Sequence, residues 1–113
     1  MTKLRLLSLE GLLEMKLNEE PFQLVEVLSA DLYRGRHIPG AINLPLEELA
    51  ETAGSRLKPG MTVVVYCGKY SCPASTNAAR KLTELGFPDV LDFKAGKHGW
   101  AAAGLAFAGK EEA

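Results

Sequence analysis

The chain lacks most of the features that mark secreted, membrane-spanning and nucleic-acid-binding proteins. Its 113 residues include only two cysteines, Cys67 and Cys72, which do not make a disulfide framework. No apolar run approaches the length that spans a bilayer, and the first residues are too interrupted for a signal peptide. A net charge of −1 argues against nucleic acid or an anionic membrane as a partner. We therefore expect a cytoplasmic protein that uses no metal and no cofactor.

What the chain does contain is an alternation of strand and helix patterns. The predicted helices are 8–17, 46–57 and 73–85, with a helical turn at 29–33. The predicted strands are 22–28, 62–67 and 90–93, and a turn over 36–45 feeds a further short strand. A glycine-rich loop at 94–100, a helix beginning at 101 and a frayed tail at 109–113 complete the chain. This alternation predicts an α/β fold with a mostly parallel sheet, and the length fits a single domain over 1–113.

One stretch, 62–76, carries both cysteines. Residues 63–65 are three consecutive valines, which is typical of a strand covered on both faces. Cys67 ends this strand and faces the start of the next helix, where ligands bind in open parallel sheets. Gly68 permits a tight turn, and Lys69 adds a positive charge. Because helix termini and inward N–H groups favour anions, we expect a lowered pKa for Cys67. Its alternative role is that of a small buried hydrophobic residue.

Two other titratable residues stand in unusual places. Glu26 lies inside the hydrophobic run 22–28, where a carboxylate needs a partner or a position at the end of the sheet. His37 precedes Pro39 and Gly40, which suit the centre of a type II turn. This histidine is either an acid or base near a site or a structural hydrogen-bonding residue.

Four segments of the chain carry recognisable motifs in a fixed order. They are the strand Leu24–Val27, the turn Gly35–Asn43 with the pattern G-x-H-I-P-G-A-x-N, the strand Val64–Cys67, and Gly96–Leu105 with the pattern G-x-x-x-W-x-x-A-G-L. Together they resemble the single-domain rhodanese-like sulfurtransferases over about residues 8–107.

The resemblance implies a five-stranded, mostly parallel sheet with helices on both faces and a persulfide on Cys67. This cysteine would accept a sulfane sulfur from thiosulfate, polysulfide or a persulfide. It would then pass the sulfur to cyanide or to the thiol of a protein or small molecule. The backbone of the loop would stabilise the persulfide anion. The loop consists of Gly68, Lys69, Tyr70, Ser71 and Cys72.

Two departures from the family pattern affect the expected donor. The usual loop is C-R-x-G-x-R-S, whereas the loop from Cys67 to Ser75 is two residues longer and has Lys69 as its only cation. We therefore expect thiosulfate to be a poor donor. The family's D-x-R at the end of the first strand is also absent, and Glu26 takes the place of the aspartate. Glu26, His37 and Ser75 are expected to lie behind the site.

Cys72 has two interpretations. Five positions after Cys67 on one loop, it is placed to attack a Cys67 persulfide or sulfenate, forming a disulfide and releasing reduced sulfur. Alternatively, it packs at the start of the helix, next to Pro73. Because it shares the helix terminus with Cys67, its pKa is also expected to be low.

Other functions remain open for the same fold. It resembles that of dual-specificity cell-cycle phosphatases and some arsenate reductases, but Pro73 replaces the arginine of the phosphatase C-x5-R motif. A two-thiol arsenate or polysulfide reductase, or a non-catalytic rhodanese-like binding module, is the alternative to a sulfurtransferase. Tyr70 is expected at the mouth of the pocket. Four basic residues either flank the pocket or are solvated: Arg34, Arg36, Lys97 and His98.

Overall fold

The computed structural model describes residues 4–110, and its centre is a parallel sheet of four strands. The strands are β1 (Phe22–Glu26), β2 (Ile42–Asn43), β3 (Thr62–Tyr66) and β4 (Val90–Asp92). Their order is β2-β1-β3-β4, so β3 lies between β1 and β4 and is hydrogen-bonded to both. The predicted α/β fold with a parallel sheet is confirmed.

The expected fifth strand is reduced to a single bridge at the edge of the sheet. Leu6 pairs with Asp92 beside β4. The N–H of Leu7 donates to the Asp92 carbonyl at 2.9 Å, and the N–H of Asp92 donates to the Arg5 carbonyl at 2.9 Å. The ladder ends there because Ser8 caps the first helix. The described residues therefore form four strands and one extended edge segment.

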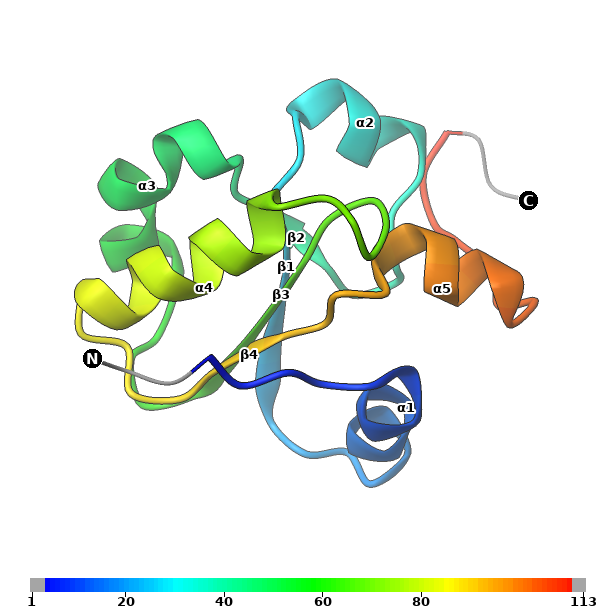
Figure 1. Ribbon diagram of the computed structural model, residues 1–113, viewed down its shortest axis with the longest axis horizontal. Helices are drawn as coiled ribbons and strands as arrows, with labels where there is room; N and C mark the ends of the chain where they lie inside the picture. Colours follow the sequence, from blue (N-terminus) through cyan, green and yellow to red (C-terminus); the bar gives the residue numbers. More distant parts are fainter. Residues whose placement is uncertain (1–3, 111–113) are drawn as a thin grey trace.

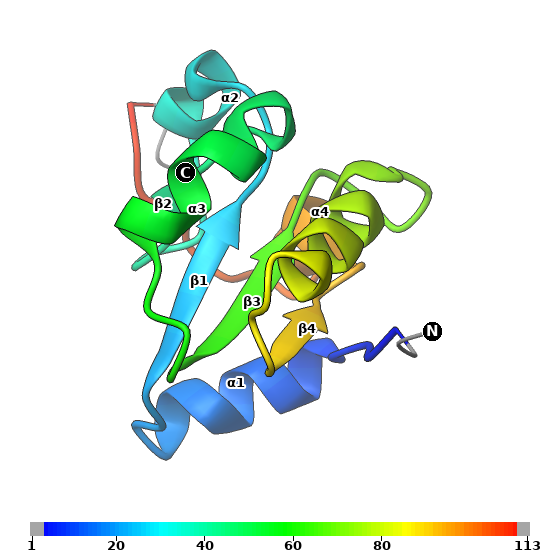
Figure 2. The same ribbon diagram turned by 90° about the vertical axis from the view of Figure 1, so that its left-hand side faces the viewer.

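Helices cover both faces of the sheet (Figures 1 and 2). The helices are α1 (Leu9–Leu17), α2 (Ala30–Gly35), α3 (Leu49–Arg56), α4 (Ala74–Glu84) and α5 (Gly96–Ala102). α3 and α4 pack on one face, and α1 and α5 on the other. Val63 and Val65 of β3 belong to the first core, whereas Val64 and Tyr66 belong to the second. All four are fully buried, which confirms the prediction of a strand covered on both faces.

One capping prediction and one turn prediction are confirmed, and one predicted helix begins differently. Ser8 caps α1, since its Oγ accepts the Gly11 N–H at 3.0 Å. Gly40 has φ 90°, and the Ala41 N–H donates to the Ile38 carbonyl at 3.0 Å, which closes the expected turn. The helix predicted at 46–57 is present, but it opens with a 3-10 turn, η1 (Leu46–Glu48), before α3.

The glycine-rich segment before Trp100 is helical from Gly96, so the loop predicted at 94–100 is correct for 94–95 and wrong for 96–100. α5 begins at Gly96 and ends at Ala102, so a helix starting at 101 is wrong as well. Helix glycines are unfavourable in isolation, but here the first N–H groups of α5 bond to the cysteine loop. The N–H of Lys97 donates to the Cys67 carbonyl at 3.0 Å. Such tertiary bonds outweigh local propensity.

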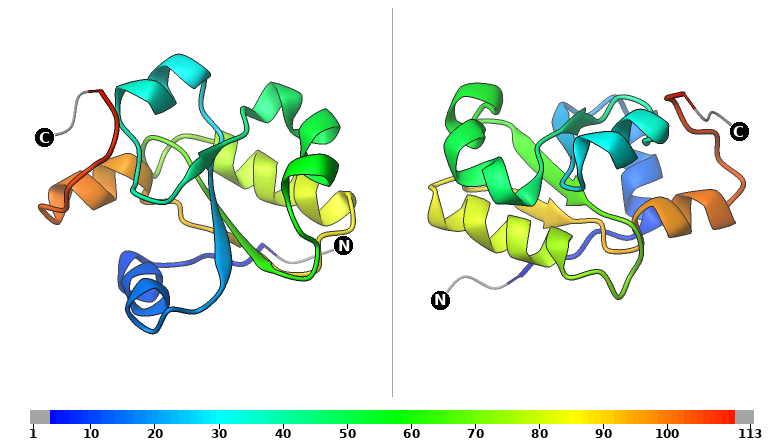
Figure 3. Two further views of the ribbon diagram at one scale, coloured as in Figure 1. Left: turned by 180° about the vertical axis from the view of Figure 1, so that it is seen from behind. Right: turned by 90° about the horizontal axis from the view of Figure 1, so that it is seen from above.

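The segment after α5 runs back along the turn that precedes β2 (Figure 3). Ala108 and His37 exchange two backbone hydrogen bonds of 2.9 Å, and the Lys110 N–H donates to the Arg34 carbonyl at 2.9 Å. The prediction of a frayed tail at 109–113 is therefore wrong for 109–110, and 111–113 lie outside the described residues. Within residues 4–110, no helix is long and apolar enough to cross a membrane.

Candidate active site

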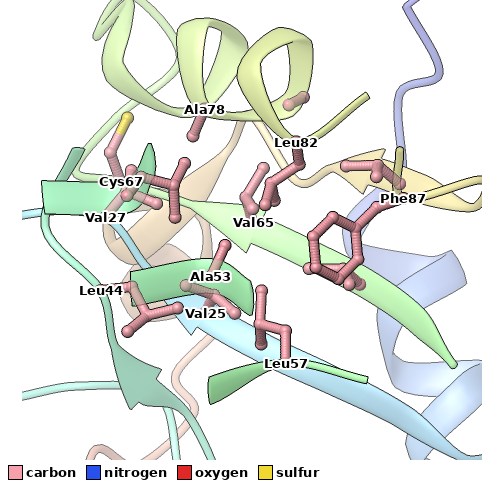
Figure 4. Close-up of a cluster of buried hydrophobic side chains, with 14 residues drawn as sticks. Val25, Val27, Leu44, Ala53, Leu57, Val65, Cys67, Ala78, Leu82 and Phe87 are labelled. Carbon is pink, nitrogen blue, oxygen red and sulfur yellow. The ribbon is translucent and has the colours of Figure 1, made fainter. Parts of the chain in front are cut away.

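Cys67 is the first residue after β3, and its side chain is completely buried between the sheet and α4. Figure 4 shows its sulfur rising from the sheet towards the part of α4 that carries Ala78. The Sγ lies 3.6 Å from the carbonyl oxygen of Cys72. A turn between Lys69 and Cys72, closed by a 3.0 Å hydrogen bond, folds the loop back over the first cysteine. The predicted position at the carboxyl end of a central strand is confirmed.

Burial raises the pKa of Cys67, contrary to the lowered value expected from the helix terminus. Desolvation is the largest cause, and the neighbouring Cys72 thiol adds to it. The hydroxyl and the N–H of Ser75 act in the opposite direction, but they do not compensate for the loss of water around a thiolate. The sequence showed the helix terminus but could not show that the loop seals the sulfur.

Cys72 is the more acidic of the two thiols. Desolvation opposes its ionisation, but hydrogen bonds from the Cys67 thiol and from the N–H groups of Ala74 and Gly68 outweigh it and lower the pKa of Cys72. The charge of Lys94 acts in the same direction. The expected low pKa of Cys72 is confirmed. The two cysteines lie close together, and the more accessible thiol is the more easily ionised of the two.

An open pocket of about 550 Å³ lies beside the loop. Its walls combine two leucines with several cationic side chains and one of the two cysteines. It is lined by Leu28, Asp31, Leu32, Gly35, Arg36, Gly68, Lys69, Cys72, Lys97 and His98. Cys72 is part of this lining and Cys67 is not. A substrate that enters the pocket therefore meets Cys72 first, in a positively charged setting.

The first residues of α5 are hydrogen-bonded to the cysteine loop. The N–H of His98 donates to the Gly68 carbonyl at 2.8 Å, next to the bond between Lys97 and Cys67. Gly96 has φ 56°, and a Cβ at this position would lie 2.3 Å from the Cys67 carbonyl oxygen. Only glycine allows the helix and the loop to approach this closely.

The partner that Glu26 requires is Lys97. The Lys97 Nζ lies 3.0 Å from Glu26 Oε2, and the Tyr66 hydroxyl donates to Glu26 Oε1 at 2.9 Å. Burial raises the pKa of Glu26, while Lys97 and Tyr66 lower it. Lys97 is buried, so the description of this lysine as a solvated surface residue is wrong. Glu26 and Lys97 are a buried ion pair behind the loop.

His37 makes the contacts of a structural residue. Its Nδ1 lies 2.8 Å from the Tyr33 carbonyl oxygen, and its ring stacks on that of Tyr33 with centroids 3.9 Å apart. It does not line the pocket. Ser75, by contrast, is fully buried next to Cys67, and its hydroxyl has no hydrogen-bond partner among the described residues.

Tyr70 and Arg34 do not form the pocket wall. Tyr70 is largely exposed and lies under Lys94, whose Nζ is 5.4 Å from the ring centroid. Arg34 forms an ion pair with Asp31 instead. Of the four basic residues predicted to flank the pocket, the pocket includes Arg36, Lys97 and His98.

The sequence did not single out Lys94 or the buried Asp92. The Lys94 Nζ donates to Thr76 Oγ1 at 2.9 Å, and this hydroxyl donates to Asp92 Oδ2 at 2.9 Å. Asp92 ends β4 and Lys94 follows two residues later. Their place at the same carboxyl edge as Cys67 is the signal that could have identified them. Within residues 4–110, no three His, Cys, Asp or Glu side chains gather as metal ligands would.

Comparison with known proteins agrees with this geometry. Residues 8–103 match the family described as the rhodanese-like domain, and the chain belongs to that family. It is 33% identical over 103 residues to the thiosulfate sulfurtransferase GlpE of Shewanella oneidensis, covering 91% of this chain and 98% of GlpE. It is 35% identical over 82 residues to the HTH-type transcriptional regulator Rv0324 of Mycobacterium tuberculosis, covering 73% of this chain but 35% of the regulator.

A solved structure agrees over most of the chain. The BH2092 protein of Bacillus halodurans superposes with a TM-score of 0.87 at 28% identity, over 96% of this chain and 79% of that one. The chain spans nearly all of GlpE but only about a third of the regulator Rv0324. The family occurs both as a separate domain and as part of longer proteins.

Proposed function

We propose that the protein is a sulfurtransferase that carries a sulfane sulfur as a persulfide on Cys67. The observation that supports this most strongly is the placement of Cys67 at the end of β3, in a sealed loop before α4. Membership of the rhodanese-like family and the full-length similarity to GlpE support sulfur transfer in general. The donor, the acceptor and the role of each residue are parts of the proposal.

The Cys67 nucleophile is generated by proton transfer between the two thiols. The lowered pKa of Cys72 makes it the first of the two thiols to ionise, and a shift of one proton from Cys67 to the Cys72 thiolate then produces the Cys67 thiolate without bringing a second charge into the site. This thiolate attacks the sulfane sulfur of thiosulfate, polysulfide or an organic persulfide, and sulfite or a shorter sulfur anion leaves. The Ser75 N–H and hydroxyl favour an anion on Cys67, and the hydroxyl has no other hydrogen-bond partner among the described residues, so both groups are available to stabilise the persulfide.

In the second half-reaction, the outer sulfur passes to a thiophilic acceptor, and the Cys67 thiolate returns. The acceptor is cyanide in an assay and a small or protein thiol under physiological conditions. The cationic pocket, with Arg36 and Lys69 in its wall, suits donors and acceptors that carry negative charge. Both thiols must be reduced to act, so the proposal includes a reducing compartment such as the cytoplasm.

Formation of thiocyanate from cyanide tests this proposal. Thiosulfate and polysulfide serve in turn as donors for wild type, Cys67→Ser and Cys72→Ser. We expect two-substrate kinetics of the ping-pong type, with loss of transfer in Cys67→Ser and slower but measurable transfer in Cys72→Ser, which lacks the thiol that takes the proton. Absence of transfer from both donors in wild type and in Cys72→Ser alike would contradict the proposal and favour a non-catalytic module.

A further inference from the structure

The two cysteines occupy unequal positions at the pocket. Cys67 is fully buried and absent from the lining, whereas Cys72 is partly exposed and forms part of the wall. A thiol acceptor that comes from solvent must pass Cys72 before it reaches a sulfur attached to Cys67. The first thiol that a Cys67 persulfide meets is therefore inside the protein.

The loop also brings the two cysteines together in the resting state. The Cys67 Sγ lies 3.6 Å from the Cys72 carbonyl oxygen, and each thiol shifts the ionisation of the other. Contact between a persulfidated cysteine and a second thiolate is the arrangement that thiol–disulfide exchange requires. The two cysteines are already neighbours, so the reaction needs neither a movement of the loop nor a second chain.

The leaving groups decide which sulfur Cys72 attacks. Attack on the outer sulfur would expel Cys67 as a thiolate, and burial makes this thiolate a poor leaving group. Attack on the Cys67 Sγ expels hydrosulfide, which is small and escapes through the open pocket. The second course is favoured because exchange is faster when the leaving sulfur anion is better stabilised.

We propose that Cys72 resolves the Cys67 persulfide, forming a Cys67–Cys72 disulfide and releasing hydrosulfide. The inference rests on the proposed function, since it begins with the persulfide. Cys72 first returns its proton to the outer sulfur of the persulfide. The resulting Cys72 thiolate forms a bond to the Cys67 Sγ, the bond between this sulfur and the sulfane sulfur breaks, and the sulfane sulfur leaves as hydrosulfide with the electron pair and the proton. The sulfane sulfur is reduced, and the two cysteine sulfurs are oxidised to the disulfide.

The cycle then requires a dithiol reductant. One thiolate of the dithiol attacks the sulfur of Cys72, which is the accessible half of the disulfide, and its second thiol completes the reduction. Both cysteines return to the reduced state, and the dithiol becomes a disulfide. The protein would thus act as a dithiol-dependent reductase of sulfane sulfur, with sulfur transfer as its first half-reaction.

A single-turnover experiment tests this resolution step. Wild type, Cys72→Ser and Cys72→Ala are mixed with thiosulfate, which contains no sulfide, in the absence of any thiol. Released sulfide is measured, and the intact mass is recorded under non-reducing conditions. Polysulfide serves as a second donor with the mass measurement alone. The unfolding midpoint of each variant shows whether it is folded.

We expect wild type to release about one sulfide per chain and to become lighter by two hydrogens, with further turnover only after a dithiol is added. Both Cys72 variants should become heavier by one sulfur atom and release no sulfide. If wild type keeps the extra sulfur as the variants do, the resolution step is overturned while the proposed function stands. If neither Cys72 variant takes up sulfur from either donor, both proposals are overturned.

Discussion

The ammonium group of Lys97 lies 3.0 Å from the Glu26 carboxylate in the interior of the protein. The same lysine donates its backbone N–H to the Cys67 carbonyl, so the ion pair connects the end of β1 to the cysteine loop. The Lys97 Nζ also donates to the Leu32 carbonyl at 3.0 Å. One residue thus joins β1, α2 and the segment that presents the nucleophile.

Removing the Glu26 carboxylate should destabilise the protein. We expect Glu26→Gln to lower the free energy of unfolding by about 3 kcal/mol, because it leaves the Lys97 charge buried without its counter-ion. Denaturant unfolding measures this change. The double variant Glu26→Gln/Lys97→Met is the control and should recover part of the loss. A single variant as stable as wild type would contradict a structural role for the pair.

Removing Lys97 alone should lower the stability of the protein by an amount that depends on pH. Burial already raises the pKa of Glu26, and Lys97→Met removes the cation that lowers it. Because the native state then binds a proton more tightly than the unfolded state, the loss of stability grows as the pH rises above the unfolded-state pKa. We expect Lys97→Met to be closer to wild type near pH 4 than near pH 7. A constant difference would be inconsistent with this assignment.

Two glycines provide a matched comparison. At Gly96, an added Cβ would lie 2.3 Å from the Cys67 carbonyl oxygen, whereas at Gly54 in α3 it would have no neighbour within 4 Å. We expect Gly96→Ala to cost about 2 kcal/mol or more and to slow sulfur uptake, since it displaces the loop. Gly54→Ala should be neutral or stabilising by up to about 1 kcal/mol. Equal effects at both positions would contradict the close approach.

The two thiols should differ in reactivity with an alkylating agent. Because the pKa of Cys72 is lowered and burial raises the pKa of Cys67, we expect iodoacetamide to modify Cys72 first, with a pH midpoint below that of an ordinary thiol. Lys94→Met should move this midpoint upward, and Lys81→Met, on the exposed side of α4, should not. Peptide mapping across a pH series measures both. Faster modification of Cys67 would contradict the assignment.

The Asp89 carboxylate should make the free energy of unfolding fall more steeply as the pH drops. Its carboxylate accepts the Thr62 hydroxyl and pairs with Arg5, and these contacts lower the pKa of Asp89. A carboxyl with a lowered native pKa stabilises the fold above its unfolded pKa and loses this effect as the pH falls through the native value. We expect Asp89→Asn to cost about 0.5 kcal/mol near neutral pH, given the exposure of the group. The difference should vanish in strong acid, as unfolding at several pH values would show.

Patterns that arise from neighbouring residues could be predicted from the sequence. The valines at 63–65 indicated the buried central strand, and the position of Cys67 indicated the edge of the sheet at which the site lies. α5 could not be predicted, because the hydrogen bonds that support its glycines come from the cysteine loop, far away in the chain. The same holds for the pairing of Glu26 with Lys97, which depends on how β1 and α5 meet.

The ionisation of the two cysteines was only half predicted, and for a physical reason. A helix terminus is visible in the sequence, and it correctly suggested a low pKa for Cys72. The exclusion of water from Cys67 depends on how the longer loop folds back, which only the three-dimensional structure reveals. Desolvation then outweighs the helix terminus at one sulfur and not at the other.

The account depends above all on Cys67 as the site of the persulfide. The most direct test is to measure sulfur uptake from polysulfide by each single-cysteine variant, followed by alkylation and localisation of the added sulfur by fragment mass spectrometry. We predict that Cys72→Ser gains one sulfur on Cys67 and that Cys67→Ser gains none on Cys72 in the same time. Uptake by Cys67→Ser at the rate of Cys72→Ser would contradict the account and make Cys72 the primary nucleophile.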